Sequence, residues 1–276
     1  MITGATRVAA VIGSPVRHSL SPALHNAAFE QLGVDWVYTA FEVAPGRAQA
    51  AVDAMRALGL GGLSVTMPHK EAIAQAVDSL DPAAAALRSV NTVVPQADGT
   101  LKGYSTDGAG FIASLAAAGV DVAGRTVCML GAGGAARSLA DALARAGAAR
   151  VAVVNRTFST ADETVRLAEG VGVHGTVADI GSADIVVNAT SIGMGSQDLP
   201  CDPSLLRAGQ VVADIVYHPR QTALLTAAAA TGATTVDGLG MLIHQAALQQ
   251  QLWHGLVPDV ATMTAAAERE LAARHQ

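Results

Sequence analysis

Short runs of apolar and β-branched residues alternate with longer alanine-rich stretches along the whole chain. Apolar runs bounded by glycine, proline or polar residues are typical of buried strands, and the longer stretches are typical of helices. The pattern predicts strands over residues 8–13, 36–43, 62–66, 90–94, 100–103, 126–130, 151–155, 185–188 and 211–215. It predicts helices over residues 21–32, 47–57, 107–118, 240–254 and 258–273, with others between the later strands. This alternation indicates an α/β fold with helices covering largely parallel sheets.

The order of these elements also indicates two domains. A first set of strands and helices ends near residue 106, and a second set begins after the glycine-bounded break at 119–124. The last two helices follow when the second set is already complete. We therefore expect one domain from residues 1–106 and 238–276, with a second domain, residues 107–237, inserted into it. Within the first domain, Asp98-Gly99 predicts a hairpin turn between two strands.

Composition narrows the class of protein. Of the 276 residues, 51% are hydrophobic and 14% are charged, which excludes a disordered chain. The net charge of −6 argues against a nucleic-acid binder or a polybasic membrane-surface protein. We see no signal peptide and no apolar run long enough to span a membrane, and the two cysteines, Cys128 and Cys201, have neither metal-site spacing nor a disulfide pattern. We expect a soluble, cytoplasmic protein without a bound metal.

A glycine-rich turn joins the predicted strand 126–130 to a helix. Its sequence, Gly131-Ala-Gly-Gly-Ala-Ala136, matches the dinucleotide-binding pattern G-x-G-x-x-A. Gly131 permits the tight turn, Gly133 lets the main chain approach a pyrophosphate, and Ala136 permits close packing of helix on strand. The alternative is a flexible turn in a glycine-rich chain. The position between strand and helix favours the dinucleotide site.

The end of the next strand bears on which dinucleotide is bound. An NAD site usually has Asp or Glu there to bind the ribose 2′-hydroxyl, but this chain has Asn155-Arg156-Thr157. Arg156 and Thr157 suit a 2′-phosphate through charge and a hydroxyl donor, which favours NADP. The alternative is an ordinary surface arginine. Thr190, after a later strand, should lie beside the same cofactor.

Two serines follow the first strand. Ser19 or Ser21 could cap the helix that has Pro22 in its first turn, since both residue types are favoured there. Capping does not need both hydroxyls, and together with the helix N-terminus they would suit a substrate carboxylate. We interpret the neighbouring His18 as structural.

Lysine is rare in this chain, and one lysine stands out. Of 17 basic residues, 15 are arginine, and only Lys70 and Lys102 are lysine. Lys70 follows the strand 62–66 at a helix start, where the helix dipole disfavours a cation and so favours the neutral amine that proton transfer requires. Arginine cannot lose its proton at physiological pH. His69 is a rival acid–base group that could instead point outward, and Lys70 could instead be an ordinary exposed lysine.

Asn91 and Asp107 complete the polar set. Asp107 could simply favour a helix N-terminus, but across a cleft from Lys70 it would hold the amine and share protons with a substrate hydroxyl.

These motifs together resemble those of the shikimate dehydrogenase family. The resemblance covers nearly the whole chain through Gly13-Ser-Pro, His18-Ser-Leu-Ser-Pro22, Val65-Thr-Met-Pro-His-Lys70, Asn91-Thr-Val93, Thr106-Asp-Gly108, Gly131-Ala-Gly-Gly-Ala-Ala-Arg137, Asn155-Arg-Thr157, Asn188-Ala-Thr-Ser191, Asp214-Ile-Val-Tyr217, Asp237-Gly-Leu-Gly-Met-Leu242 and Gln245-Ala246. It implies NADPH-dependent reduction of 3-dehydroshikimate to shikimate in the chorismate pathway. It also implies that the split domain binds substrate through its mixed or parallel sheet and that the inserted domain is a Rossmann domain for NADP.

The resemblance assigns roles by motif position. Lys70 and Asp107 are the implied catalytic pair, and Ser19, Ser21 and Tyr217 are the implied carboxylate ligands. Thr66, Asn91 and Gln245 would hold ring hydroxyls. The implied cofactor residues are Gly131, Gly133, Gly134, Ala135, Asn155, Arg156, Thr157 and Thr190, with Gly238 and Met241 near the nicotinamide. The implied partner is a small-molecule substrate, and a homodimer is possible.

The chain departs from the family pattern twice. Ser105 replaces the usual Asn before Thr-Asp, which bears on substrate choice. Phe158-Ser-Thr160 stands where a second basic residue is common, which bears on NADP against NAD. The alternatives are a quinate/shikimate dehydrogenase using NAD, a methylenetetrahydrofolate dehydrogenase-like enzyme, and a nucleotide-sensing protein without activity. The twin serines and the Asn91 and Asp107 pair favour a small polyhydroxy acid over a pterin, and retention of Lys70 and Asp107 favours an enzyme.

Overall fold

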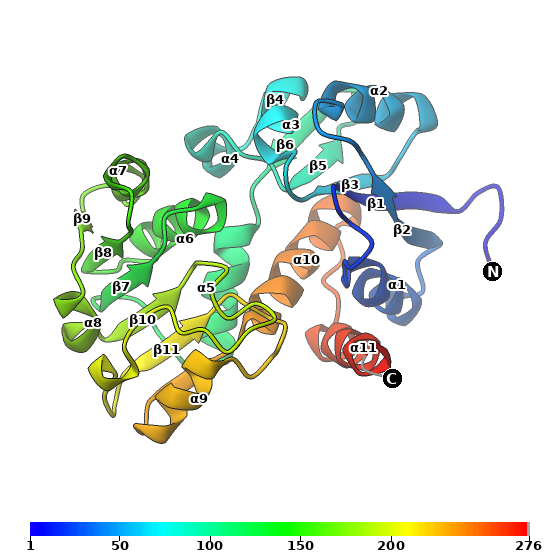
Figure 1. Ribbon diagram of the computed structural model, residues 1–276. Coiled ribbons are helices and arrows are strands. Elements are labelled where there is room, and N and C mark those ends of the chain that lie inside the picture. Colours follow the sequence, from blue (N-terminus) through cyan, green and yellow to red (C-terminus); the bar gives the residue numbers. More distant parts are fainter. Residues whose placement is uncertain (275–276) are drawn as a thin grey trace. The chain divides into compact units, whose positions relative to one another are not determined.

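The computed structural model describes residues 1–274 and divides the chain into two compact units (Figure 1). The first unit combines residues 1–106 with the residues from Gln245 onward, and the second spans Asp107–His244. Each unit holds one six-stranded sheet with helices. The α/β fold class is therefore confirmed, and the second unit interrupts the first in sequence. The division falls inside helix α10 (Gly238–His254), whereas the sequence pattern puts it at the first residue of that helix.

The first unit has a mixed sheet with strand order β2-β1-β3-β5-β6-β4. Its strands are β1 (Arg7–Gly13), β2 (Trp36–Glu42), β3 (Gly62–Val65), β4 (Ser79–Leu80), β5 (Thr92–Pro95) and β6 (Leu101–Tyr104). Its helices are α1 (Ser21–Leu32), α2 (Ala48–Leu58), α3 (Lys70–Ala76), α4 (Pro82–Leu87), the greater part of α10, and α11 (Val260–Ala273). Strands β1, β2 and β3 are parallel, whereas β5 is antiparallel to both β3 and β6.

Strand β1 is buried on both faces, which explains its continuous apolar sequence. Alternate residues of a strand point to opposite faces. Ala10 and Ile12 pack with residues of α2 and α3, namely Val52, Met55 and Ile73. Ala9 and Val11 belong to a second cluster on the other face, with Phe29, Tyr38 and Trp253. Helices therefore cover both faces of this sheet.

The second unit has an all-parallel sheet with strand order β12-β11-β10-β7-β8-β9. Its strands are β7 (Thr126–Leu130), β8 (Arg150–Val154), β9 (Gly172–His174), β10 (Ile185–Asn188), β11 (Val211–Asp214) and β12 (Thr234–Val236). Its helices are α5 (Asp107–Ala117), α6 (Gly134–Arg145), α7 (Phe158–Leu167), α8 (Ala178–Ser182), the 3-10 turn η1 (Pro203–Leu205) and α9 (Ala223–Ala230). The chain builds outward from β7 in one direction and then from β10 in the other, the doubly wound order of a Rossmann fold.

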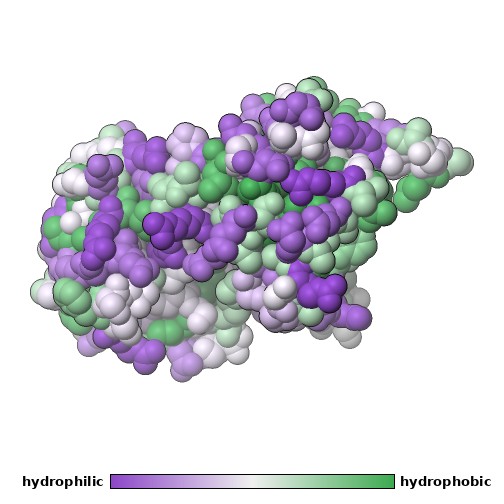
Figure 2. All heavy atoms as spheres, turned by 90° about the horizontal axis from the view of Figure 1, so that it is seen from above, coloured by the Kyte–Doolittle hydropathy of each residue, from purple (hydrophilic) through white to green (hydrophobic). Residues whose placement is uncertain are grey.

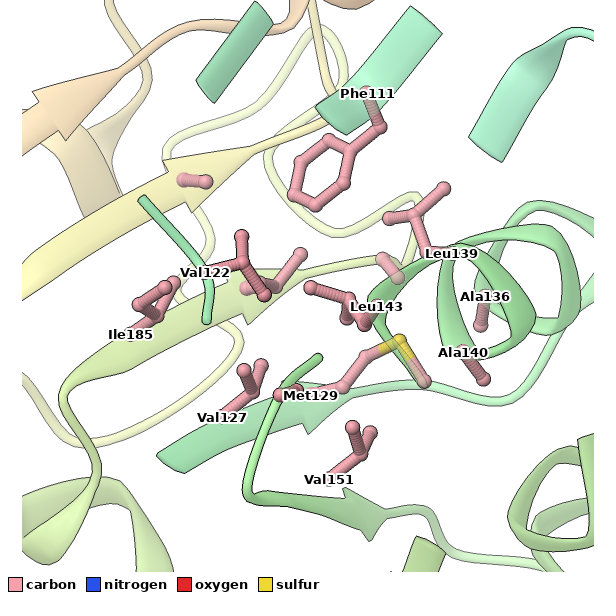
Figure 3. Packing of buried hydrophobic residues seen from close by; sticks show 14 of the residues in the cluster. Phe111, Val122, Val127, Met129, Ala136, Leu139, Ala140, Leu143, Val151 and Ile185 are labelled. Atoms are coloured by element: carbon pink, nitrogen blue, oxygen red, sulfur yellow. The ribbon is translucent and has the colours of Figure 1, made fainter. Parts of the chain in front are cut away.

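Both faces of this sheet are also covered. Val127 and Met129 of β7 face α5 and α6, where Phe111, Leu139 and Leu143 point toward the strands (Figure 3). Cys128 and Leu130, the alternate residues, pack on the other face against residues of α8 and α9, namely Ile180, Leu224, Leu225 and Ala228. Parallel sheets are typically covered by helices on both faces, and strands buried on both faces must be apolar throughout.

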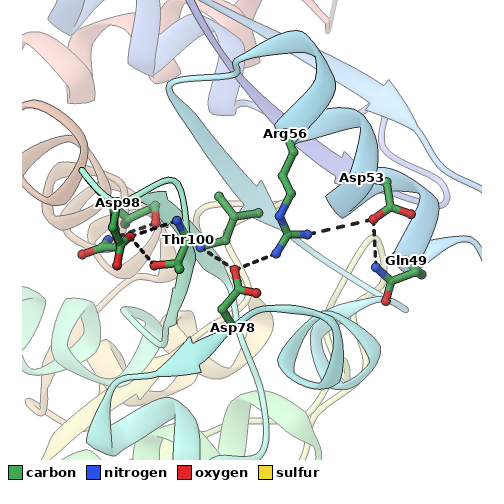
Figure 4. Close-up of polar contacts among 9 residues, drawn as sticks. Gln49, Asp53, Arg56, Asp78, Asp98 and Thr100 are labelled. Carbon is green, nitrogen blue, oxygen red and sulfur yellow. Dashed lines mark hydrogen bonds and ion pairs between the residues drawn. The ribbon is translucent and has the colours of Figure 1, made fainter.

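Polar contacts fix the hairpin of the first unit and tie it to α2 (Figure 4). Asp98 accepts hydrogen bonds from the amide and hydroxyl of Thr100 at 3.0 and 2.7 Å, and Gly99 has a φ of +85°, so the predicted hairpin turn is confirmed. Asp78 accepts from Arg56 of α2 at 2.6 Å and from the amide of Leu101 at 2.7 Å. These hydrogen bonds hold the pKa of Asp78 below its usual value.

The longer predicted elements are confirmed, with changes at their ends. The predicted strand 90–94 begins only at Thr92 and runs to Pro95. Helix α10 begins at Gly238, two residues early, because Asp237 accepts from the amides of Leu239 and Gly240. Helix α11 begins at Val260 because Asp259 caps it. The short strands β4, β9 and β12 were not predicted, since so few residues carry no periodicity.

Polar and apolar side chains are interspersed on the face of the molecule drawn in Figure 2. Between residues 1 and 274, no helix is both long and apolar enough to cross a membrane.

One titratable residue is buried in the core of the first unit. The ring of His25 is fully buried and stacks on Tyr38, with ring centroids 4.2 Å apart. The side-chain amide of Gln250 donates to its Nδ1 at 3.0 Å. Burial lowers the pKa of His25 from 6.5 to about 3, because the charged ring would lose its hydration.

This lowered pKa predicts an acid-sensitive fold. The unfolded chain binds a proton at His25 below pH 6.5 while the folded chain resists it until about pH 3, so stability is complete above 6.5 and is lost as the pH falls. Between pH 7 and pH 4 we expect His25 to cost about 3 kcal/mol of unfolding free energy. Urea denaturation of wild type and His25→Phe across this range should show a shallower pH dependence in the variant. Equal slopes would show that His25 does not titrate with unfolding.

Candidate active site

The polar residues singled out in the first unit come from segments that meet at one edge of its sheet. Strands β1 and β3 are parallel neighbours, so the segments that follow them leave at the same edge. Strand β5 runs in the opposite direction and therefore begins at this edge, and β6 ends there. Ser19 and Ser21 follow β1, Thr66 and Lys70 follow β3, and Asn91 directly precedes β5. Strand direction alone thus brings five predicted residues to one edge.

The two segments after β1 and β3 are joined by main-chain hydrogen bonds. The amide of Ser14 donates to the carbonyl of Met67 at 3.0 Å, and the amide of Thr66 donates to that of Ile12 at 2.9 Å. Gly13 permits this approach, because a Cβ at that position would lie 2.4 Å from Cγ2 of Thr66. A glycine at the end of β1 therefore sets the position of Thr66.

Neither serine caps α1 with its side chain, so that interpretation of the sequence is wrong. Ser21 is the first helical residue, Leu20 occupies the cap position, and no side chain caps the helix. The Ser19 hydroxyl instead accepts from the amide of Ser21 at 3.2 Å. The cap is missing because the chain already turns into helical geometry at Leu20. Ser21 is buried and Ser19 is half-buried.

Lys70 is the first residue of α3, as predicted, and is half-buried. Its carbonyl accepts from the amide of Val90 at 3.0 Å, which fixes the helix start against the segment leading to β5. His69 does not point outward: it is 1% exposed, and its Nε2 bonds to the carbonyl of Val43 at 2.7 Å. The alternative in which His69 points outward is therefore wrong, because the ring is buried and bonded to the segment that follows β2.

Asn91 is the most constrained of these side chains. Its Oδ1 accepts from the amide of Thr106 at 2.9 Å and from the hydroxyl of Thr92 at 2.8 Å. Its Nδ2 donates to the Thr106 hydroxyl at 2.9 Å and to Oε1 of Gln245 at 3.5 Å. The structure thus brings together Asn91 and Gln245, which are 154 residues apart in sequence. Both side chains are buried.

Asp107 belongs to the second unit, where it opens α5. The following Gly108 packs on α6, since a Cβ there would lie 2.4 Å from the carbonyl oxygen of Ser138. That contact holds the helix start that carries Asp107.

The glycine turn in the second unit has the geometry that the sequence predicts. Gly131 has a φ of +101°, and a Cβ there would lie 2.7 Å from Cγ2 of Thr190. Ala136 is fully buried against the sheet. Gly133 and Gly134 are exposed, and no atom lies within 4 Å of where their Cβ atoms would be. The turn therefore offers open main chain at the start of a 12-residue helix, where a phosphate is favoured.

The segment after β8 is exposed and has no carboxylate in its first residues. The Asn155 side chain donates to the carbonyl of Thr157 at 3.0 Å, which shapes the turn, and Arg156 is exposed. Phe158 is 70% exposed and stacks on His174, with ring centroids 4.2 Å apart. Arg156 and Phe158 therefore both lie at the carboxyl edge of the parallel sheet.

A buried polar cluster joins the ends of β10 and β11, and no pattern described above predicts this cluster. Asp214 accepts from Nδ2 of Asn188 at 2.9 Å, from the hydroxyl of Thr222 at 2.8 Å and from the amide of Val216 at 3.0 Å. Asn188 in turn accepts from the Thr190 hydroxyl at 2.7 Å. Burial raises the pKa of Asp214, and these donors oppose that rise. The sequence feature that could have predicted this cluster is a polar residue at the end of each of two buried strands.

The remaining predicted residues lie nearby in the second unit. Tyr217 follows β11 and is half-buried. Gly238 is required by packing, because a Cβ there would lie 2.4 Å from the carbonyl oxygen of Ile215. Met241 packs against the core cluster around Val127 and Met129.

Comparison with known proteins assigns this architecture. Three family models match the chain: the shikimate dehydrogenase substrate binding domain over residues 11–93, shikimate / quinate 5-dehydrogenase over 114–194, and the shikimate 5′-dehydrogenase C-terminal domain over 238–268. The shikimate dehydrogenase (NADP(+)) of Moorella thermoacetica is 43% identical over 95% of this chain and 92% of its own length. The chain belongs to the shikimate dehydrogenase family.

Two solved structures show how widely the shikimate dehydrogenase fold is shared. The shikimate 5-dehydrogenase of Thermus thermophilus, in complex with NADP(H) and shikimate, is 37% identical, with a TM-score of 0.88 over 96% of this chain and 99% of that one. The quinate dehydrogenase of Corynebacterium glutamicum, in complex with NAD, is 34% identical, with a TM-score of 0.88 over 95% and 98%. The fold alone therefore does not distinguish these substrates and cofactors.

The two departures from the family pattern have structural counterparts. The amide of Ser105 donates to Asp81 at 3.3 Å, so this residue is tied to the start of α4 through its main chain. At the second departure, Phe158 stacks on the His174 ring.

Proposed function

We propose that this chain catalyses the reversible, NADPH-dependent reduction of 3-dehydroshikimate to shikimate. The observation that carries the proposal is the set of hydroxyl and amide side chains gathered with Lys70 at one edge of the first sheet. A small polyhydroxy acid presents one carboxylate and several ring hydroxyls, and these side chains match such groups. The chain's shikimate dehydrogenase relatives support the same reaction.

The residues of the second unit fit NADP. The open main chain at Gly133, Gly134 and Ala135, at the start of α6, suits a pyrophosphate. Asn155, Arg156 and Thr157 would hold the ribose 2′-phosphate, and Thr190, Gly238 and Met241 would line the rest of the cofactor site. When bound, the nicotinamide supplies the hydride.

The residues of the first unit would bind and protonate the substrate. Ser19 and Ser21, with Tyr217 of the second unit, would hold the carboxylate, and Thr66, Asn91 and Gln245 would hold ring hydroxyls. Lys70 would give its proton to the C3 oxygen as the carbonyl becomes a hydroxyl. Asp107 would accept a hydrogen bond from the neighbouring hydroxyl and orient the Lys70 ammonium group. Acid catalysis and positioning each supply about 10²-fold or more.

A quinate/shikimate dehydrogenase that uses NAD is the second candidate. The absence of a second basic residue near Phe158 and the likeness to a quinate dehydrogenase favour it. Purified protein tested with shikimate and with quinate, each with NADP⁺ and with NAD⁺, separates the two. A preference for shikimate with NADP⁺ supports our proposal, and a preference for quinate with NAD⁺ overturns it.

We further propose that the protein is cytoplasmic, that it forms a homodimer, and that it binds a small-molecule substrate. The net charge of −6 disfavours nucleic acid and anionic membrane surfaces. Molar mass from light scattering tests the dimer.

Replacing Lys70 should abolish most turnover. Lys70→Ala should lower kcat for shikimate oxidation by at least about 100-fold while NADP⁺ affinity stays unchanged, because the amine serves only proton transfer. Lys70→Arg should fail as well, since guanidinium does not release its proton. Lys102→Ala is the matched control and should retain activity, because Lys102 lies over the Tyr104 ring. Near-normal turnover in Lys70→Ala would show that a group other than Lys70 supplies the proton.

Arg156 should determine the preference for NADP⁺. A charge-assisted hydrogen bond contributes about 1.5–3 kcal/mol, so Arg156→Ala should raise KM for NADP⁺ by roughly tenfold or more and leave KM for NAD⁺ nearly unchanged. Arg166→Ala is the control, since Arg166 pairs with Asp162 on the same helix. An equal rise in KM for NADP⁺ and for NAD⁺ would show that Arg156 contacts a part of the dinucleotide that both cofactors share, and not the 2′-phosphate.

Ser21 should bind substrate without stabilising its helix. Because no side chain caps α1, Ser21→Ala should lower Tm by no more than the loss of its hydrogen bond with Tyr38, but should weaken shikimate binding by roughly tenfold, as expected for one hydrogen bond to a charged group. The double replacement of Ser19 and Ser21 should be worse than either single one, and NADP⁺ affinity should not change. A lower Tm with unchanged shikimate affinity would contradict the assignment.

A further inference from the structure

One face of α10 is aligned with Asn91 and the strand β5 that follows it. Gln245, Gln249 and Trp253 are spaced by four residues and so lie on one face. The Gln249 side-chain amide donates to the carbonyl of Asn91 at 3.3 Å, and the Trp253 indole donates to that of Val93 at 3.1 Å. Four helical residues rise about 6 Å and two strand residues about 6.6 Å, so successive donors meet alternate carbonyls. The helix is thus in register with the strand.

Close packing reinforces this register. The Trp253 ring lies directly against Gly62 of β3, where a Cβ would be 2.4 Å from the indole. The helix therefore cannot slide along the sheet without losing these two hydrogen bonds and this contact together.

A chain of buried hydrogen bonds meets α10 at Gln249. Because Nε2 of Gln249 donates to a carbonyl, its Oε1 faces Ser64, and the Ser64 hydroxyl must donate to it, at 2.7 Å. The Ser64 oxygen then accepts from the phenol of Tyr38, also at 2.7 Å. Each hydroxyl has one proton, so the direction from Tyr38 to Asn91 is fixed. Burial raises the pKa of Tyr38, which keeps the phenol protonated as a donor.

The chain of hydrogen bonds ends on a residue of the candidate active site. The carbonyl of Asn91 accepts from Gln249, and the Asn91 side chain donates to Gln245, one helical turn away from Gln249. Tyr38, Ser64 and Gln249 are each at most 5% exposed, so solvent cannot replace a lost partner. Such a network is costly unless every member is satisfied, and then it fixes geometry.

We propose that Gln249 is a positioning residue, which holds the amides of Asn91 and Gln245 where they bind the ring hydroxyls of the substrate. This inference rests on the proposed function, since it acts through two residues assigned to substrate there. Gln249 itself would touch neither substrate nor cofactor. Its effect should therefore fall on KM for shikimate and not on the use of NADP⁺.

The first test removes the amide. In Gln249→Leu we expect KM for shikimate to rise about tenfold, kcat to fall less, and KM for NADP⁺ to stay within twofold of wild type. Gln210→Leu is the matched control, because Gln210 is equally buried and donates to the carbonyls of Ile180 and Ala183 in the second unit. It should lower Tm and leave KM for shikimate unchanged. If Gln249→Leu lowers Tm but leaves KM unchanged, Gln249 is only structural and the inference is wrong.

The second test gives a signature that a purely structural role would not. The titratable group that faces Gln249 is the buried ring of His25, which hydrogen-bonds the Gln249 side chain. In Gln249→Glu, a protonated carboxyl group can accept from Ser64 and donate to the carbonyl of Asn91 as glutamine does, whereas a carboxylate cannot donate. The ratio of KM for shikimate between variant and wild type should therefore start near one at pH 5.5 and rise at least about fivefold by pH 9. A ratio independent of pH overturns the inference, even where the leucine variant does not fold.

The wild-type assay separates failure of this inference from failure of the proposed function. If wild type does not oxidise shikimate with NADP⁺, the proposed function falls and this inference falls with it. If wild type is active and both Gln249 variants bind shikimate normally at every pH, only this inference falls.

Discussion

The direction of neighbouring strands is the constraint on which the candidate site depends. Parallel strands end at the same edge of a sheet, so the segments that follow β1 and β3 must meet, and those that follow β7, β8, β10 and β11 must meet in the second unit. Antiparallel β5 then brings Asn91 to the edge at which β1 and β3 end. The strand directions thus bring candidate site residues that are far apart in sequence to the same edge of each sheet.

Both edges use glycine where the main chain must approach closely. Gly13 lets Thr66 pack against the end of β1, and Gly131 adopts a positive φ beside Thr190. In both places a side chain would collide with a predicted site residue. These glycines serve local packing that positions the site, and the phosphate-facing role proposed for Gly133 and Gly134 is separate, since those positions are open.

Buried, hydrogen-bonded polar groups hold the strand ends in place at the edge of each sheet. Asp214 in the second unit is surrounded by donors from Asn188, Thr222 and Val216. In the first unit, Gln249 and Ser64 are each satisfied by a directed hydrogen bond. Burying such groups is favourable only when their partners are in place, so both clusters resist small displacements of the strand ends. Each cluster lies next to residues that the proposed function uses.

The sequence by itself determined the fold class, the longer helices and strands, the hairpin at Asp98-Gly99 and the glycine turn at Gly131, because each has a local periodicity or a residue with special backbone freedom. It also carried the motifs that identify the family and single out residues such as Lys70 and Asn91. Only the tertiary structure decided that His69 is buried on Val43, that neither Ser19 nor Ser21 caps α1, and that α10 lies in register with β5 through Gln249. The physical reason is that burial and hydrogen-bond partners depend on contacts between segments up to 256 residues apart, which no local pattern records.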